Sequence, residues 1–247
     1  MTTYTVYFAG DLFDHKHLAG NKLLAGAVDR RSGGRYACVL PQDLEQATER
    51  MVDIRNQDLM QVMACDLGLF NFDGTDLDSG TVVEFMMAKM LDIPSVLLRS
   101  DFRASGDQER EGDDWNLMCS FYPRSRKVQF NAMAWYQEAR RDGSPGDDGP
   151  GDGGSGNVDL DDGGAENGGP DGTPGTWSDR LYNRMADAVI EALDAVRTEP
   201  SAFGGDEARI SAVYAWAARF PGSGFDALCG PGFVEKTIEE KRRKGLL

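Results

Sequence analysis

The sequence predicts an α/β fold, built on a doubly wound parallel sheet of five strands with helices added at the C-terminal end. Short apolar and β-branched runs alternate with longer helix-like segments over residues 3–131, which is typical of βαβ units. Two of the runs, 66–72 and 95–99, are largely apolar, as expected of central strands covered on both faces. We therefore expect a site at the carboxyl ends of the strands.

The first elements follow from local patterns. Residues 3–9 are β-branched and aromatic and end at Ala9-Gly10, which predicts a first strand and its turn. The polar stretch 17–28 predicts a helix, and residues 36–40 predict a short strand that Pro41 ends. Apolar residues recur at helical spacing within 43–65, so we expect a second helix there.

The later elements of the sheet complete a flavodoxin- or Rossmann-like pattern. Residues 66–72 predict the third strand, and residues 82–91 predict the helix that follows it. Pro94 separates this helix from the strand expected at 95–99, and residues 127–131 predict a fifth strand. We therefore assign residues 1–141 to one α/β domain.

The composition changes abruptly after Arg141. Residues 142–176 contain 13 Gly, 4 Pro and 9 acidic residues without any Lys or Arg, too little apolar surface to offset the entropy of ordering. We expect a disordered acidic insertion there. Apolar residues at helical spacing predict helices at 179–196 and 206–220, and the charged segment 235–247 predicts a frayed helix or a partner contact. Residues 177–247 are thus expected to form a helical extension that packs on the α/β domain.

Charge and composition restrict the class of protein. The net charge of −15 would repel phosphate backbones, which argues against a nucleic-acid partner. No apolar run approaches a membrane span and the first residues lack a signal pattern, so we expect a cytoplasmic protein. The four cysteines lack CxxC spacing, which argues against a zinc ribbon or a redox motif. The acidity also suggests a high-salt habitat as a hypothesis.

The segment 78–84 is the strongest chemical signal. It joins a strand-like run to a helix-like run, with small residues where the chain must turn. Asp78 stands before the predicted helix and Glu84 inside it, where we expect the helix dipole to favour their ionised forms. An ionised carboxylate at such a crevice suits attack on an electrophilic carbon. Helix capping by Ser79 or Thr81 explains the segment equally well.

Three more residues point to the same edge of the sheet. Tyr7 ends the first strand, Gln42 follows the second, and Asp58 lies on the helix before the third. Taken singly, Tyr7 and Gln42 fit a core or loop role better, and Asp58 also fits a solvated helix position. His15 and His17 are the only histidines, and without a third ligand we expect them in an exposed loop, not in a metal site.

Five short motifs in order along residues 4–131 resemble one family, the nucleoside 2-deoxyribosyltransferases. They are Tyr7-Phe8-Ala9-Gly10-Asp11-Leu12-Phe13, Leu40-Pro41-Gln42, Asn56-Gln57-Asp58-Leu59 followed by Cys65-Asp66, Asp78 with Glu84 six residues later, and Trp115-Asn116-Leu117-Met118. The resemblance implies base exchange on 2′-deoxyribonucleosides and free nucleobases in nucleotide salvage. It also implies a homo-oligomer of two or more subunits, with neither a metal nor an organic cofactor.

The resemblance implies a double displacement with three catalytic residues. Glu84 would attack C1′ of the deoxyribose as the base leaves, giving a covalent deoxyribosyl-enzyme. Asp58 would protonate the departing base and deprotonate the incoming one, and Tyr7 would orient Glu84. This follows the logic of retaining glycosyl transfer.

The resemblance also implies the residues that bind the substrate. Asp78 would hold the sugar hydroxyls and Gln42 would contact the base, while Gly10 belongs to the opening motif. Asn116 would complete the site, in known members across a subunit boundary. Short members end soon after this asparagine and use a C-terminal residue in the neighbouring site. The longer chain here does not allow that residue to be assigned.

Two alternatives stay open. Related N-glycosidases hydrolyse deoxynucleoside 5′-monophosphates, but they use a Ser/Arg-rich loop after the first strand, where this chain has Asp11-Leu12-Phe13-Asp14. That charge favours a nucleoside over a nucleotide, although simple nucleoside hydrolysis remains an alternative. A non-catalytic nucleoside-binding protein would keep the fold without needing Glu84.

Overall fold

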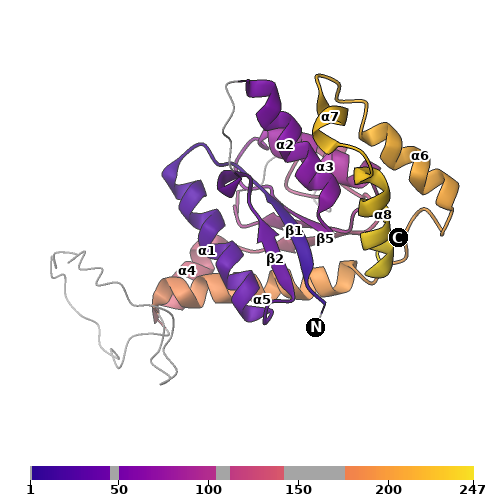
Figure 1. Ribbon diagram of the computed structural model, residues 1–247. Coiled ribbons are helices and arrows are strands. Elements are labelled where there is room, and N and C mark those ends of the chain that lie inside the picture. The colour runs from indigo at the N-terminus through magenta and orange to yellow at the C-terminus, as the bar shows by residue number, and fades with distance from the viewer. Residues whose placement is uncertain (1, 45–49, 104–111, 142–175) are drawn as a thin grey trace, which may run out of the picture.

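A computed structural model describes residues 2–44, 50–103, 112–141 and 176–247. Its centre is a parallel five-stranded sheet in the order β2-β1-β3-β4-β5, seen in Figure 1. The strands are β1 (Tyr4–Ala9), β2 (Tyr36–Val39), β3 (Leu67–Asn71), β4 (Ser95–Arg99) and β5 (Ser125–Gln129). The predicted doubly wound α/β fold with five parallel strands is confirmed.

The register places the fifth strand two residues earlier than predicted. Leu98 of β4 pairs with Val128 of β5, and Ser95 pairs with Ser125. Val128 is the buried residue of β5, whereas its charged neighbours at 126 and 127 are exposed. An edge strand tolerates such residues, and they hid its start in the sequence.

Side chains of each strand alternate between two hydrophobic cores. Val6 and Phe8 of β1 face the core formed with α1 (His15–Arg31) and α5 (Trp177–Val196). Tyr7 and Ala9 face the other core, which contains α2 (Met51–Ala64) and α3 (Ser79–Met90). The period of two in a strand therefore decides which side of the sheet Tyr7 reaches.

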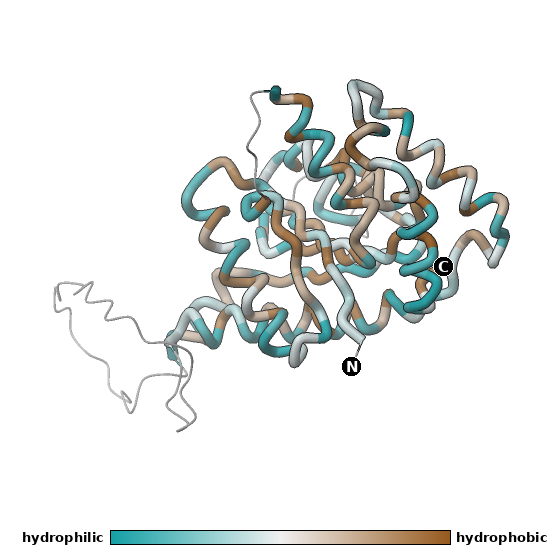
Figure 2. The backbone as a smooth tube through the Cα atoms, in the orientation of Figure 1, coloured by the Kyte–Doolittle hydropathy of each residue, from teal (hydrophilic) through white to brown (hydrophobic). Residues whose placement is uncertain are grey.

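The C-terminal helices cover both faces of the sheet. The long helix α5 packs beside α1 on one face, with α4 (Ala132–Arg141) against it. Helices α6 (Glu207–Ala217), α7 (Phe225–Cys229) and α8 (Phe233–Arg243) lie on the face of α2 and α3. Figure 2 shows hydrophobic segments gathered at the sheet and hydrophilic ones along the outer turns. Residues 177–247 thus complete both cores.

Several local expectations need correction. His15 and His17 lie in the first turn of α1, not in a loop, because Asp14 caps this helix by accepting from the backbone N–H of Lys16 and His17. Helices α4 and α7 were not predicted. Thr176 caps α5 in a reciprocal capping box with Asp179. Apart from Thr176, the acidic insertion expected at 142–176 lies outside the described residues.

The charged C-terminal segment forms a docked helix. Lys241 of α8 is 2% exposed and donates to the carbonyl of Cys65. The carbonyl of Leu246 accepts from Arg124 at 2.9 Å. Neither a frayed end nor a partner contact describes residues 233–247 as well as this intramolecular packing. None of the helices within the described ranges has the length and apolarity to cross a membrane.

Candidate active site

The centre of the candidate site is a hydrogen bond between a strand and a helix. Tyr7 Oη donates to Glu84 Oε1 at 2.7 Å, across 77 positions of sequence. Tyr7 is only 1% exposed, and Glu84 lies in the second turn of α3, facing the sheet. Two predicted site residues are thus in direct contact.

The environment of Glu84 raises its pKa from 4.5 to about 8. Burial is the main cause, and the negative charges of Asp58 and Asp78 act in the same direction. The hydrogen bond from Tyr7 opposes this shift. The expected ionising effect of the helix dipole does not prevail for Glu84, because the dipole acts mainly within the first turn and burial outweighs it.

Asp58 lies on α2, near enough for its charge to affect both Glu84 and Tyr7. Burial raises the pKa of Asp58 from 3.8 to about 6. Its Oδ1 atom is buried and accepts no hydrogen bond from any described residue. A carboxyl group with a pKa near neutrality is suited to both donate and accept a proton.

Asp78 is the N-cap of α3. Its Oδ2 accepts from the backbone N–H of Thr81 at 2.7 Å and from the Thr81 hydroxyl at 2.8 Å. Capping and site formation are therefore combined in one residue, and neither Ser79 nor Thr81 is the cap. The other carboxylate oxygen, Oδ1, has no such bond to Thr81 and is the atom that remains for a ligand.

Gln42 and Gly10 follow β2 and β1, as predicted. The amide of Gln42 donates to the carbonyl of Leu18 at 2.8 Å, so this group is directed at α1. Contact of Gln42 with a base stays a prediction. A Cβ atom at Gly10 would come 3.1 Å from Cβ of Asn71, at the end of β3. A side chain there would push the ends of β1 and β3 apart.

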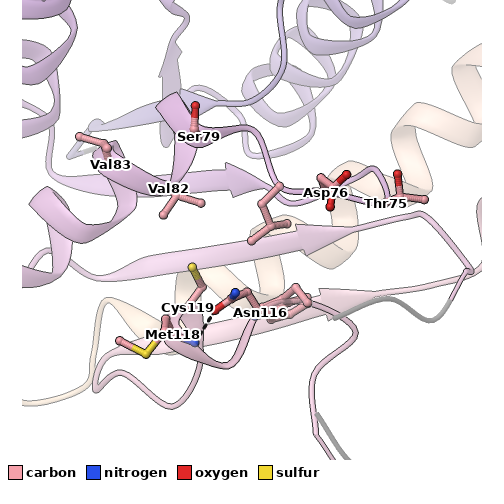
Figure 3. A pocket seen from close by; sticks show the side chains of 10 residues that line it. Thr75, Asp76, Ser79, Val82, Val83, Asn116, Met118 and Cys119 are labelled. Carbon is pink, nitrogen blue, oxygen red and sulfur yellow. Dashed lines mark hydrogen bonds between the residues drawn. The ribbon is translucent and has the colours of Figure 1, made fainter. Parts of the chain in front are cut away.

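Asn116 lines a cavity that Glu84 does not line. Figure 3 shows it beside Met118 and Cys119, across a cavity of about 630 Å³ from the first turns of α3. Its side chain accepts from the backbone N–H of Met118 at 2.9 Å, which caps the short helix η2 (Leu117–Cys119). The cavity meets α3 at Ser79, Val82 and Val83, and Glu84 is not among the residues that line it.

A second cavity, of about 560 Å³, opens at the carboxyl ends of the central strands. Its lining is dominated by carboxylates: Asp11, Asp73, Asp76, Asp78 and Asp101. Arg103 also lines it, but this arginine is paired with Asp101. The cavity that contains Asp78 is therefore strongly acidic.

Arg99 is a residue of the site that the sequence reading missed. It is 0% exposed at the end of β4 and donates to the carbonyls of Phe72, Gly74 and Arg103. These bonds fix the loop between β3 and α3, which leads to Asp78. An arginine that ends an otherwise apolar strand was the available signal.

Metal ligation finds no support in the described ranges, where His, Cys, Asp and Glu do not form a group of three suited to an ion. His17 approaches Asp14 and Asp11, with Nδ1 at 3.1 Å and 3.8 Å from their carboxylates. These contacts belong to the start of α1.

Comparison with protein families gives one match. Residues 6–118 match the sequence model of the family described as nucleoside 2-deoxyribosyltransferase. The match spans β1 to the asparagine segment and includes all the predicted site residues. A comparison with curated proteins found no significant match.

Three solved structures are similar to part of the chain. A conserved protein from Enterococcus faecalis V583 is 24% identical, with a TM-score of 0.43, over 52% of this chain and 92% of that chain. A 2-deoxyribosyltransferase from Leishmania mexicana is 23% identical, with a TM-score of 0.40, over 48% and 86%. A 2-deoxyribosyltransferase from the psychrotolerant bacterium Bacillus psychrosaccharolyticus is 19% identical, with a TM-score of 0.37, over 51% and 85%.

Proposed function

Because residues 6–118 belong to the nucleoside 2-deoxyribosyltransferase family, we propose that this protein exchanges the base of 2′-deoxyribonucleosides through a covalent deoxyribosyl-Glu84 intermediate. The main support is the 2.7 Å hydrogen bond from Tyr7 to Glu84 Oε1. This bond orients the carboxylate and leaves Oε2 free for attack, as nucleophilic catalysis requires.

The first step forms one bond and breaks another. Glu84 Oε2 attacks C1′, and the electron pair of the glycosidic bond leaves with the base. Asp58 donates its proton to the departing base nitrogen, so the base leaves neutral. The raised pKa of Asp58, about 6, supports this role, because a carboxyl group near neutrality can carry the proton that it donates.

The second step reverses the first with another base. A ring nitrogen of the incoming base attacks C1′ and the ester bond to Glu84 breaks. Asp58 takes the proton from that nitrogen, which restores both carboxyl groups. Asp78 Oδ1 is the proposed acceptor for a sugar hydroxyl, and Gln42 the proposed contact to the base.

The protonation of the two carboxyl groups supports a shared proton. The reaction starts with Glu84 ionised and Asp58 protonated, so the pair holds one proton. With pKa values of about 8 and about 6, the pair holds one proton across the neutral range. In the free protein this proton resides mainly on Glu84, so it has to pass to Asp58 in the substrate complex before Glu84 attacks C1′.

The acidic cavity supports a nucleoside as substrate. Asp11 and Asp73 line the same cavity as Asp78 and would repel a 5′-phosphate. The phosphate-binding loop of the related N-glycosidases has no counterpart in this charge pattern.

The position of Asn116 supports a site shared between two copies of the chain. Within one chain this residue lines a cavity that Glu84 does not line. Near it, Met118 and Phe121 are 72% and 78% exposed, an apolar surface suited to a second subunit. We expect a mixture of inactive Asn116→Ala and Glu84→Ala subunits to regain activity, whereas separate sites would leave the mixture inactive.

Incubation with deoxyinosine and free adenine tests the reaction. Base exchange produces deoxyadenosine, whereas a hydrolase produces only free deoxyribose and a binding protein leaves deoxyinosine intact. Deoxyinosine 5′-monophosphate in the same assay should react far more slowly. Glu84→Ala should lower exchange by about 10⁴-fold or more in a folded protein. Unchanged turnover of this variant would exclude the covalent mechanism.

A further inference from the structure

The helix that holds Asp58 is supported from behind by the C-terminal extension. Asn56 is 1% exposed and its amide donates to the carbonyl of Ser223 at 3.2 Å. The adjacent Arg55 donates to the carbonyl of Pro221 at 3.0 Å and to the Asn56 side-chain oxygen at 2.7 Å. Two backbone carbonyls of one loop therefore bind consecutive residues of α2.

The loop that provides these carbonyls has a fixed shape. Gly222, Ser223 and Gly224 all have positive φ, at 62°, 54° and 85°. The N–H of Phe225 closes the turn on the carbonyl of Gly222 at 3.0 Å, and the Phe225 ring is fully buried in the core with α2. The loop is thus anchored on both sides of Ser223.

Asn56 and Asp58 are on opposite sides of α2. Residues two apart on a helix are separated by about 200°. Asn56 is directed at the C-terminal loop, whereas Asp58 lies close enough to Glu84 and Tyr7 for its charge to act on both. The helix therefore lies between the loop and the candidate site.

Among the described residues, the carboxyl group of Asp58 has no hydrogen bond of its own that fixes Oδ1. The helix also begins without a side-chain cap, because Arg50 at the N-cap makes no such bond. The position of the Asp58 carboxyl group therefore depends on how the backbone of α2 is held.

We propose that Asn56, bound to the carbonyl of Ser223, is a positioning residue that sets Asp58 for proton transfer to and from the base. This inference rests on the proposed function. It gives the C-terminal extension a part in the reaction that the family match, which ends at residue 118, does not include.

The test compares two substrates that differ in their need for a proton. The base of deoxyinosine must be protonated to leave, whereas the cationic base of 7-methyl-2′-deoxyguanosine leaves without a proton. In single-turnover experiments without an acceptor base, Asn56→Ala should slow release of the base from deoxyinosine by about 10- to 100-fold, the effect of a small misplacement of a catalytic group. Release of the methylated base under the same conditions should stay within about two-fold of the wild-type rate, a pattern that Asp58→Asn should share.

A second pair of variants leaves Asn56 intact. Ser223→Gly keeps the carbonyl and suits the positive φ, so it should retain wild-type rates. Ser223→Val strains the turn and should reproduce the selective loss on deoxyinosine. This pair keeps the test valid even if Asn56→Ala unfolds.

The control removes a different bond from the same extension. Tyr214 of α6 donates to the carbonyl of Leu91 at 3.1 Å in the core, away from α2. Tyr214→Phe should lower Tm without a selective loss of rate. Equal losses on both substrates, or no loss, in Asn56→Ala and Ser223→Val would overturn the positioning role. If the wild-type protein has no activity, the proposed function itself fails. If the wild type is active and the variants show no selective loss, only the positioning role fails.

Discussion

Carboxylates at the two ends of the sheet differ in whether they are paired with a cation. At the amino ends of the strands, each buried carboxylate has a cationic partner. Asp92 pairs with Arg124 at 2.8 Å, and Asp66 accepts from Lys244 and from the N–H and hydroxyl of Thr5. A buried charge that is paired and hydrogen-bonded stays ionised at modest cost.

At the carboxyl ends, the carboxylates of the candidate site have no such partners. In the described part of the chain, neither Glu84 nor Asp58 forms an ion pair, and Glu84 receives a hydrogen bond from Tyr7 alone. The pKa of Glu84 rises to about 8 and that of Asp58 to about 6 in consequence. Raised pKa values at neutral pH mark groups reserved for proton transfer and attack.

The contrast separates residues that stabilise the fold from residues proposed to act in the reaction. Changes at the amino ends should alter unfolding and spare the rate, and changes at the carboxyl ends should do the reverse. The following predictions test this separation in order of expected effect.

Removing the proton donor should have the largest effect. Asp58→Asn should lower base exchange by about 10²- to 10⁴-fold, the usual range for general acid–base catalysis, without loss of Tm. Asp53→Asn on the same helix is the matched control, because Asp53 forms a partly exposed ion pair with Arg50 and has no proposed part in the reaction. Steady-state rates of both variants measure the effect on catalysis, and thermal melts measure the effect on stability. Equal rates for the two variants would contradict the role of Asp58.

Breaking the paired end should affect stability instead. Arg124→Met leaves Asp92 buried without its cation and should cost about 3–5 kcal/mol of unfolding free energy. Arg126→Met, two residues further along the chain, breaks the exposed pair with Glu199 and should cost about 0–1 kcal/mol. Denaturant titration measures both. The rate per folded molecule should be unchanged, and a large fall in that rate would erase the contrast between the two ends.

Removing the hydroxyl that orients Glu84 should have an intermediate effect on rate. Tyr7→Phe loses a hydrogen bond to a charged group worth about 1.5–3 kcal/mol, which corresponds to about 10- to 100-fold in rate. Tyr36→Phe removes a similar bond, to Asp194 at 2.7 Å on the other face of the sheet. Its rate should be that of the wild type. Similar kinetics for both variants would show that the Tyr7 hydroxyl has no part in the reaction.

Stability should also depend on pH. Since the folded-state pKa of Glu84 is about 8 and its ordinary value 4.5, the folded protein binds more protons between these values. Stability contributed by neutral Glu84 is therefore present below pH 4.5 and lost as pH rises toward about 8. Glu84→Gln, which stays neutral, should gain in Tm over the wild type across that window. A difference in Tm that is constant with pH would refute the raised pKa.

Local patterns were enough to predict most of the sheet. The run at 95–99 is apolar and follows Pro94, and it forms β4 at those bounds. Helix α5 was expected because its apolar residues recur on one side. Helix α7 escaped prediction because it has five residues between two glycines, too few to show a period.

In the candidate site, too, some features follow from local sequence and others depend on distant residues. Asp78 before α3 and Glu84 within it follow from a strand, a turn and a helix in succession. The helix-dipole expectation failed for Glu84, because its pKa depends on burial by neighbours far away in the sequence. The contact of Asn56 with Ser223 joins residues 167 positions apart, and no local pattern indicates it.

The sequence by itself determined the succession of the strands and of most helices, and the set of candidate carboxylates. These properties depend on neighbours within a few residues, whose spacing fixes periodicity and backbone hydrogen bonding. Only the tertiary structure decided which carboxylates are paired and which are not. Pairing and desolvation depend on side chains brought together from distant segments, and the cost of a buried charge depends on those neighbours.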